Sequence, residues 1–274
     1  MHAASSREAL EGARVELEAA LRGSDAPATT GVTVGTELLS VSATVSDDRA
    51  LRTALGDSAT APDLRAGIAE RVLTGKVHDL TRQTVASAAA RHWSTDADLV
   101  AGLASLGREA LLLSAKDSGE LDTVEDELFR LSRVVKDNTE LEQALCDPAR
   151  SASDRAGLLA SLIAGKVNPV TERLAVQAIT TDTDNAPGDV IDSLSGLAAA
   201  ANGRKVAYVS SATELSAQQR TELAGKLSAI YDSPVTLHID IDPELLGGVV
   251  VRVGDERIDG SIAGRLAALR RSLR

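Results

Sequence analysis

The sequence has very few aromatic residues: one Trp, two Tyr and one Phe among 274 residues, of which 43% are apolar. A core without aromatic rings must be built from Leu, Val, Ile and Ala, which pack well where helix backbones approach closely. The composition therefore favours an Ala- and Leu-rich helical protein, and the length suggests roughly two domains.

Cysteine is also scarce, because Cys146 is the only one. A single cysteine excludes an intrachain disulfide framework and a thiolate metal cluster. The four histidines are scattered, and no two of them have the i, i+4 spacing that places two imidazoles on one helix face for a metal ion. We predict neither a metal nor a cofactor.

Basic charge and long hydrophobic runs are lacking as well. Lys and Arg total 29 against 40 Asp and Glu, a formal charge of −11, and so acidic a surface repels phosphate backbones, so we expect no nucleic-acid partner. Nowhere does the chain reach the ~20 apolar residues that span a bilayer. The first residues of the chain are charged throughout and contain no apolar segment of the kind that forms the core of a signal peptide. We therefore expect a soluble protein without a signal peptide.

The chain contains an internal repeat. Residues 37–77 align without gaps on residues 127–167, and 16 of the 41 positions are identical, where chance gives roughly a handful. A period of 90 is too long for a solenoid unit and suits a small domain. The sequence therefore predicts two successive helical bundles.

Helical spacing is clear in the second copy. Leu99, Leu103, Leu106, Ala110 and Leu113 recur at steps of three and four, so they share one face of a helix. Ser94 or Thr95 can cap this helix, and a second helix is expected after an Asp122 N-cap. In the first copy we expect a helix over 6–22, a loop over 23–33 that lacks periodicity, and a helix from Thr36.

The pattern changes beyond residue 190. Residues 206–211, 235–241 and 249–253 read as strands, Ser216 and Gln219 form a capping box, and residues 256–258 are expected to pair back on the third strand. Ser261 is expected to cap a last helix. The predicted fold is mainly α with a small α/β (α+β) C-terminal domain: two tandem helical bundles, 1–95 and 96–188, a linker helix, 189–204, and a strand–helix–hairpin domain, 205–274.

We find no set of residues placed for catalysis. No Ser, His and Asp combination has a context that would aim a nucleophile, and no paired carboxylates stand out. An enzyme alternative, an acyl or phosphoryl transferase using Gly247 and Gly248, would bind a nucleotide or coenzyme. The more ordinary interpretation of these glycines is a bulge or a close backbone approach.

The stretch DPELLGGVVVRVGDERIDGSIAGRLAALRRSL, residues 242–273, resembles the C-terminal signature of the delta subunit of the rotary ATP synthase, the family of the mitochondrial oligomycin-sensitivity-conferring protein. The residues that match the pattern are Asp242, Pro243, Gly247, Gly248, Gly254, Asp255, Ile258, Asp259, Gly260, Ser261, Arg265 and Leu266. Because glycine recurs where turns need unusual backbone angles, we interpret these residues as structural. The resemblance covers about residues 98–274, and residues 1–95 resemble the duplicated domain of a long form found in high-GC bacteria.

The resemblance implies a non-catalytic stator subunit in the peripheral stalk of the proton-translocating ATP synthase. Such a subunit links the N-terminal helices of the alpha subunits in the catalytic head to the membrane-anchored b subunits, so that rotation is coupled to ATP synthesis. It implies a place on the cytoplasmic side of the bacterial plasma membrane, contact with the membrane only through the complex, and no small-molecule substrate.

The family position of the partner groove maps onto the helices at 99–114 and 170–179. On that basis Ala110, Leu113, Leu174 and Ala178 are the candidate groove residues, although helical periodicity fits an internal core equally well. Arg270 and Arg271 are candidates for contact with an acidic b-subunit tail, or form a solvated helix end.

Two further questions stay open. The first copy can clasp another alpha-subunit helix or lie along the b subunits as a brace. An alternative function is a helical adaptor unrelated to ATP synthase that binds amphipathic partner helices in a groove.

Overall fold

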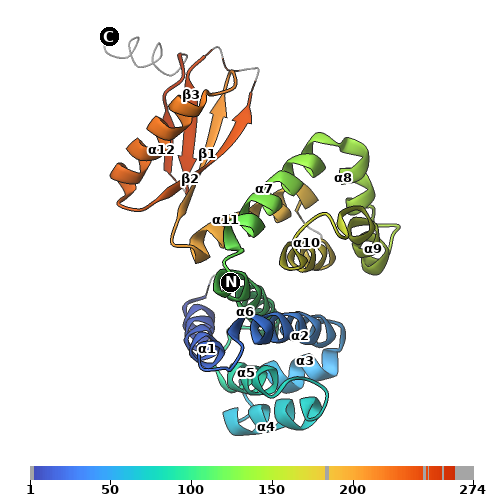
Figure 1. The fold of residues 1–274 in the computed structure, drawn as a ribbon. Coiled ribbons are helices and arrows are strands. Elements are labelled where there is room, and N and C mark those ends of the chain that lie inside the picture. The colour runs from blue at the N-terminus through green and yellow to red at the C-terminus, as the bar shows by residue number, and fades with distance from the viewer. Residues whose placement is uncertain (1–2, 183–184, 243–244, 246, 255, 263–274) are drawn as a thin grey trace, which may run out of the picture. The chain divides into compact units, whose positions relative to one another are not determined.

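The computed structural model describes residues 3–182, 185–242, 245, 247–254 and 256–262. The chain divides into two compact units, which meet between Leu194 and Ser195 in the sequence. The predicted class, mainly α with a small C-terminal sheet domain, is confirmed (Figure 1). The helices are α1 (Ala4–Arg22), α2 (Pro27–Asp47), α3 (Arg49–Gly56), α4 (Pro62–Leu73), α5 (Asp79–Ala90), α6 (Asp96–Asp117), α7 (Leu121–Asp137), α8 (Thr139–Cys146), α9 (Ala152–Ile163), α10 (Pro169–Thr181), α11 (Pro187–Ala201) and α12 (Ala217–Tyr231), and the strands are β1 (Lys205–Ser211), β2 (Val235–Ile241), β3 (Val249–Val253) and β4 (Glu256–Asp259).

The first hydrophobic core draws on all of the helices α1 to α6. Leu17 of α1, Leu38 of α2 and Val85 of α5 are fully buried in it, and Leu103 of α6 is buried beside them. Trp93, the only tryptophan, is also buried there, and its indole N–H donates to the carbonyl oxygen of Ala88 at 2.8 Å. The core of the first five helices therefore extends into the helix that begins after residue 95.

Among the described helices, the most extensive helix–helix contact is between α2 and α6. A Cβ added to Gly35 would lie 2.8 Å from the carbonyl oxygen of Gly107, and a Cβ added to Gly107 would lie 3.0 Å from the carbonyl oxygen of Gly35. Only glycine leaves room for two backbones at this separation, so the two residues set the crossing point of the helices.

The expected loop over 23–33 is wrong, because α2 begins at Pro27 and continues to Asp47. Proline is favoured in the first turn of a helix, where its missing N–H costs nothing. The hydroxyls of Thr33, Thr36, Ser40 and Thr44 donate to carbonyl oxygens four residues back. Apolar periodicity is absent from residues 27–33 because the buried residue of this stretch is Gly31, which has no side chain to mark a buried face.

A second expectation is also wrong. The helix α7 begins at Leu121, after Glu120, and not after an Asp122 N-cap. The amide of Glu120 instead donates to the carbonyl oxygen of Ala115 at 2.7 Å, so the turn that ends α6 sets the start of α7. The N-cap at Thr95 is confirmed, since its hydroxyl accepts a hydrogen bond from the amide of Asp98 at 3.0 Å.

The second unit contains a four-stranded mixed sheet in the order β2-β1-β3-β4. β1 and β2 are parallel and are connected through α12, whereas β3 is antiparallel to both β1 and β4. Ala207, Val209, Val251 and Val253 are buried together with Leu227 of α12, which covers one face of the sheet (Figure 1). The expected strands and the pairing of 256–258 on β3 are confirmed, while the helix expected after Ser261 lies outside the described residues.

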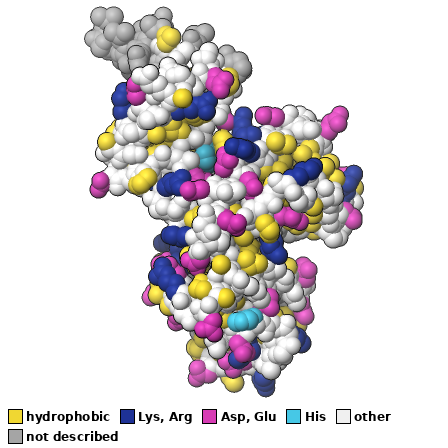
Figure 2. All heavy atoms as spheres, in the orientation of Figure 1, with side chains coloured by type: hydrophobic (Ala, Val, Ile, Leu, Met, Phe, Trp, Pro, Cys, Tyr) yellow, Lys and Arg dark blue, Asp and Glu magenta, His cyan; other side chains and the backbone are white. Residues whose placement is uncertain are grey.

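The net negative charge of the chain lies in its first unit, residues 1–194, which we call the helical unit. Residues 1–194 contain 31 Asp and Glu against 19 Lys and Arg, whereas residues 195–274 contain nine against ten. Figure 2 shows acidic and basic side chains interspersed on the face in view.

Candidate partner-binding site

The repeat is visible as two equivalent, partly buried sets of hydrogen bonds between helices, which we call ties. In the first copy, one carboxylate oxygen of Glu37 accepts hydrogen bonds from the amide of His78, at 2.9 Å, and from the hydroxyl of Thr81. This tie joins α2 to the start of α5, and Thr81 is fully buried. A charged acceptor makes each of these bonds stronger than a bond between neutral groups.

The second copy has the same arrangement 90 residues later. One carboxylate oxygen of Glu127 accepts from the amide of Asn168 at 2.8 Å and from the hydroxyl of Thr171 at 2.7 Å. Thr171 is fully buried, as its counterpart is. Glu37 and Glu127 are among the identities of the repeat, but sequence reasoning missed the tie because the threonines lie beyond the gap-free alignment.

Helix caps and chain reversals repeat too. The side chains of Asp48 and Asn138 accept from backbone amides at the starts of α3 and α8. Gly75 and Gly165 follow the ends of α4 and α9 with φ of +72° and +70°, a conformation that favours glycine. The two copies therefore share their turns and ties as well as their sequence.

The candidate groove residues are mostly internal. Ala110, Leu174 and Ala178 are fully buried, and Leu113 is half-buried against the first core. Ala110 also belongs to that first core, whereas Leu174 and Ala178 lie on α10. The helices α6 and α10 contact each other, so the structure places the two pairs on neighbouring helices.

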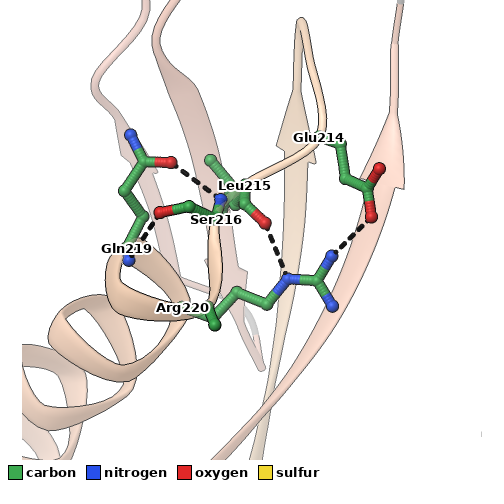
Figure 3. A pocket seen from close by; sticks show the side chains of 6 residues that line it. Glu214, Leu215, Ser216, Gln219 and Arg220 are labelled. Carbon is green, nitrogen blue, oxygen red and sulfur yellow. Dashed lines mark hydrogen bonds and ion pairs between the residues drawn. The ribbon is translucent and has the colours of Figure 1, made fainter.

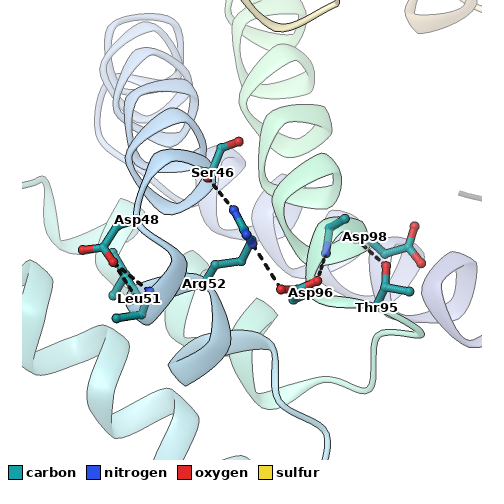
Figure 4. A network of polar contacts seen from close by, with 9 residues as sticks. Ser46, Asp48, Leu51, Arg52, Thr95, Asp96 and Asp98 are labelled. Atoms are coloured by element: carbon teal, nitrogen blue, oxygen red, sulfur yellow. Dashed lines mark hydrogen bonds and ion pairs between the residues drawn. The ribbon is translucent and has the colours of Figure 1, made fainter.

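The start of α6 is fixed by polar contacts to three helices of the first copy. The guanidinium of Arg52 on α3 donates to a carboxylate oxygen of Asp96 at 3.1 Å (Figure 4). From α1, the hydroxyl of Ser6 donates to Asp98 at 2.9 Å, and from α2 the hydroxyl of Ser42 donates to the carbonyl oxygen of Val100 at 2.9 Å. These contacts hold α6 against the first copy along its first two turns.

A further ion pair joins α1 to the middle of α6. The guanidinium of Arg14 donates to a carboxylate oxygen of Glu109 at 2.6 Å. Burial raises the pKa of Glu109, and the hydrogen bond from Arg14 counteracts only part of that shift. The same carboxylate raises the pKa of Arg14, so the pair joins α1 to α6 through a charge-assisted hydrogen bond.

The signature glycines allow a close backbone approach at the end of the sheet. Gly248 has a φ of +83°, and a Cβ added there would lie 2.5 Å from the carbonyl oxygen of Gly260. The amide of Gly260 donates to the carbonyl oxygen of Val249 at 2.9 Å, and the amide of Ile262 donates to that of Gly247 at 3.0 Å. These glycines thus bring the strand β3 and the turn after β4 together.

The remaining signature residues differ in their structural roles. A carboxylate oxygen of Asp259 accepts from the amide of Ser261 at 3.0 Å and from its hydroxyl at 2.6 Å, which lowers the pKa of Asp259. Asp242 follows β2 and donates its amide to Ser211, Gly254 has a φ of +58°, and Ile258 lies in β4. The other candidates lie outside the described residues: Pro243, Asp255, Arg265, Leu266, Arg270 and Arg271.

A shallow hollow lies at the start of α12 (Figure 3). The hydroxyl of Ser216 accepts from the amide of Gln219 at 3.2 Å, and the side chain of Gln219 accepts from the amide of Ser216 at 2.9 Å, which confirms the predicted capping box. Arg220 donates to the carbonyl oxygen of Leu215 and forms an ion pair with Glu214 at 3.0 Å. The polar groups that line the hollow are hydrogen-bonded or ion-paired with one another. The hollow is therefore the capped start of a helix and not a set of catalytic side chains.

Over the described stretches, no cluster of three or more His, Cys, Asp or Glu side chains is arranged to hold a metal ion. None of the helices in those stretches has the length and apolar character needed to cross a membrane.

The fold defines the class of the protein: it is an internally duplicated helical protein with a small mixed-sheet domain. Residues 108–273 match the family model described as "ATP synthase delta (OSCP) subunit". A protein of Rhodococcus opacus (strain B4) named "ATP synthase subunit delta" is 49% identical over 273 residues, covering 99% of this chain and 98% of the relative. The protein of the same name from Nocardia farcinica (strain IFM 10152) is 49% identical over 270 residues, covering 98% and 99%.

The chain therefore belongs to the ATP synthase delta (OSCP) subunit family, and it is a non-catalytic stator subunit that is peripheral to the membrane complex. A solved chain of the Toxoplasma gondii mitochondrial ATP synthase hexamer is 26% identical and covers 61% of this chain and 94% of that chain. Its TM-score of 0.38 is too low to support a statement about shared geometry.

Proposed function

We propose that this chain connects the alpha subunits of the catalytic head to the b subunits of the peripheral stalk, on the cytoplasmic side of a bacterial plasma membrane. The observation that carries the proposal is the match to delta subunits over nearly the whole chain, including residues 1–95. An interface that resists torque must be large, because interfaces below about 1,200 Å² tend to be transient.

The helical unit suits the alpha-subunit end of this connection. It is poor in aromatic residues, rich in closely packed helices and acidic, which fits an amphipathic partner helix with basic residues on its polar face. Ala110, Leu113, Leu174 and Ala178 remain the proposed groove residues. At the other end of the connection, we propose that the C-terminal unit binds the b subunits and that Arg270 and Arg271 take part in this contact.

The first test is calorimetric titration of the full chain with a peptide of the cognate alpha subunit's N-terminal residues. We expect saturable binding that weakens as salt increases, because basic residues of the peptide would face an acidic unit. A matched peptide with the same composition in scrambled order controls for charge alone. Equal binding of both peptides, or of neither, would contradict the proposal for the alpha-subunit end.

The b-subunit end needs its own measurement. We expect the C-terminal residues of the b subunit to bind the full chain, and the double variant Arg270→Ala, Arg271→Ala to bind less tightly. The control is Arg130→Ala, an exposed cation of α7 far along the chain from the C-terminal unit. If the double variant binds as tightly as the wild type, the two C-terminal arginines have no role in this contact.

A further inference from the structure

The two faces of the C-terminal sheet carry different side chains. Helix α12 packs on the face that carries Ala207, Val209 and Val251, where the second core lies (Figure 1). Side chains alternate between the two faces along each strand, so Tyr208 and Arg252 belong to the opposite face, which we call the second face. The packing of α12 therefore gives no role to the second face.

One row of residues on the second face crosses all four strands. The residues opposite one another in the register are His238 on β2, Tyr208 on β1, Arg252 on β3 and Arg257 on β4. Exposure increases along this row, because His238 is buried, Tyr208 is half-buried and both arginines are exposed. A Cβ added to Gly196 of α11 would lie 3.8 Å from the hydroxyl oxygen of Tyr208. The end of α11 therefore lies near the β1 part of the row, and the arginine end is accessible to a partner.

The two arginines of this row are directly opposite each other. Arg252 pairs with Arg257 in the antiparallel register of β3 and β4. Side chains at such positions share a face, and their Cβ atoms lie about 4.5–5.5 Å apart. Like charges in this arrangement are unfavourable, whereas opposite charges are favourable. An anionic partner that contacts both guanidiniums would therefore be favoured at this place.

The described carboxylates nearest in sequence are bound to other groups. Glu256 lies on the α12 face, where one of its oxygens accepts a hydrogen bond from the hydroxyl of Tyr231 at 2.9 Å. One oxygen of Asp259 accepts two hydrogen bonds from Ser261. The other oxygen of Asp259 is 4.0 Å from Arg257, a long and exposed ion pair that contributes little.

The guanidinium of Arg252 lies against an aromatic ring. Its central carbon is 5.2 Å from the centre of the Tyr208 ring, a distance typical of a cation–π interaction. Within the described part of the chain, Arg252 forms no ion pair in addition to this contact. The ring orients the guanidinium and leaves its N–H donors available for carboxylate oxygens, which arginine binds in a bidentate manner.

We propose that Arg252 and Arg257 together bind an acidic helix, through two carboxylates on adjacent turns of that helix. Residues at i and i+4 of a helix have Cβ atoms about 5–6 Å apart, which matches the separation of opposite residues in a strand pair. Each guanidinium can therefore contact one carboxylate without a change in the sheet. The source of this helix is the b subunit, and in this respect the inference rests on the proposed function, which assigns the b subunits to the C-terminal unit.

An acidic helix fits this site better than an anionic membrane does. Lipid surfaces attract clusters of roughly four to eight basic residues, whereas the C-terminal unit has ten Lys and Arg against nine Asp and Glu, and the chain as a whole has a charge of −11. A membrane would face many of these charges at once. A single helix would contact the two arginines alone, because charges more than about 10 Å away are largely screened at 0.1 M salt.

The test is calorimetric titration of the full chain with two peptides at about 0.1 M salt. The first is the C-terminal peptide of the cognate b subunit, and the second is a model helix that carries one pair of glutamates at i and i+4. We expect both peptides to bind saturably. A model helix in which glutamine replaces the two glutamates should bind about tenfold more weakly, and equal binding of the two model helices would overturn the inference.

The variant Arg252→Gln, Arg257→Gln should bind both peptides about tenfold more weakly than the wild type. Its matched control is Arg220→Gln, Lys226→Gln, which removes the same charge from exposed positions of α12, on the other face of the sheet. The control should bind as the wild type does, and circular dichroism should show that both variants keep their fold. An equal loss of binding in both variants, or no loss in the first, would overturn the inference.

A charge reversal gives a further check. In Arg257→Glu the new carboxylate stands opposite Arg252 and competes with the acidic helix for its guanidinium. We therefore expect Arg257→Glu to bind the model helix more weakly than Arg257→Gln does. If Arg257→Glu binds this helix as tightly as the wild type, the inference is wrong.

The two peptides separate a failure of the inference from a failure of the proposed function. Binding of the model helix but not of the b-subunit peptide would support the site for an acidic helix and contradict the b-subunit contact. Binding of the b-subunit peptide that the Arg252→Gln, Arg257→Gln variant leaves unchanged would overturn the inference and leave that contact standing. If the wild type binds phosphatidylglycerol vesicles through these arginines and binds neither peptide, the site belongs to a membrane surface and both ideas fail.

Discussion

Removing the tie between Glu127 and Thr171 should reveal a large coupling between two side chains on different helices. The carboxylate accepts the Thr171 hydroxyl at 2.7 Å and the Asn168 amide at 2.8 Å, and Thr171 is fully buried. Hydrogen bonds to a charged group contribute roughly 1.5–3 kcal/mol, and an unpaired buried donor costs about 1–3 kcal/mol. We therefore expect Glu127→Ala to lower the free energy of unfolding by about 2–4 kcal/mol and Thr171→Val by about 1.5–3 kcal/mol.

The two losses should not add. Once Glu127 is absent, the Thr171 hydroxyl has lost its partner, so the double variant should be less destabilised than the sum by about 1.5 kcal/mol or more. The assay is urea unfolding of the wild type, both single variants and the double variant, followed by helical circular dichroism. In the same cycle, Thr221→Val on the exposed side of α12 should show no coupling to Glu127.

The repeat supplies an internal replicate of this experiment. Glu37→Ala with Thr81→Val should give a coupling of similar size, because the first copy has the same tie and Thr81 is equally buried. A coupling below about 0.5 kcal/mol in both copies lies within ordinary non-additivity. That result would refute the reasoning that these carboxylates hold α5 to α2 and α10 to α7.

Three further outcomes are expected. Gly248→Ala should destabilise the C-terminal unit by about 2 kcal/mol or more, because its φ is +83° and the new Cβ would meet the Gly260 carbonyl oxygen; a lowered melting temperature would show it, and an unchanged one would contradict it. Asp259→Ala should reduce the stability at neutral pH, because the hydrogen bonds from Ser261 favour the charged form of Asp259. The difference in stability from the wild type should shrink as the pH falls through the lowered pKa of Asp259. Urea unfolding at a series of pH values measures this difference, and a difference that persists in acid would refute the prediction. Ser216→Ala should speed amide exchange at the start of α12 and cost about 1 kcal/mol, and equal exchange rates would show that the capping box contributes nothing.

Much of the fold followed from local patterns. The periodic leucines predicted α6, the alternating valines and isoleucines predicted β2 and β3, and Ser216 with Gln219 predicted the start of α12. These signals work because one face of each element is apolar and its period differs between helix and strand. The limits of the predicted domains, 1–95, 96–188, 189–204 and 205–274, stay a prediction, although α6 contacts helices on both sides of residue 95.

The candidate groove shows what periodicity could not resolve. Ala110 and Leu174 have the spacing of an apolar face, but a groove wall and a core position have the same spacing. Only the packing of the surrounding helices shows that both side chains are fully buried. Pro243, Arg270 and Arg271 lie outside the described residues, so their roles stay predictions.

The sequence by itself determined the duplication, the helical class and the signature, because identities at a fixed shift and side-chain periods are properties of the chain alone. It did not reveal α2 before residue 36, since Gly31 and Gly35 have no side chains to mark a buried face. Tertiary structure decided that these glycines meet Gly107 on α6 and that α6 serves both copies. The physical reason is that close helix packing depends on which backbones approach each other across the 72 residues between Gly35 and Gly107, and no local sequence pattern records such a contact.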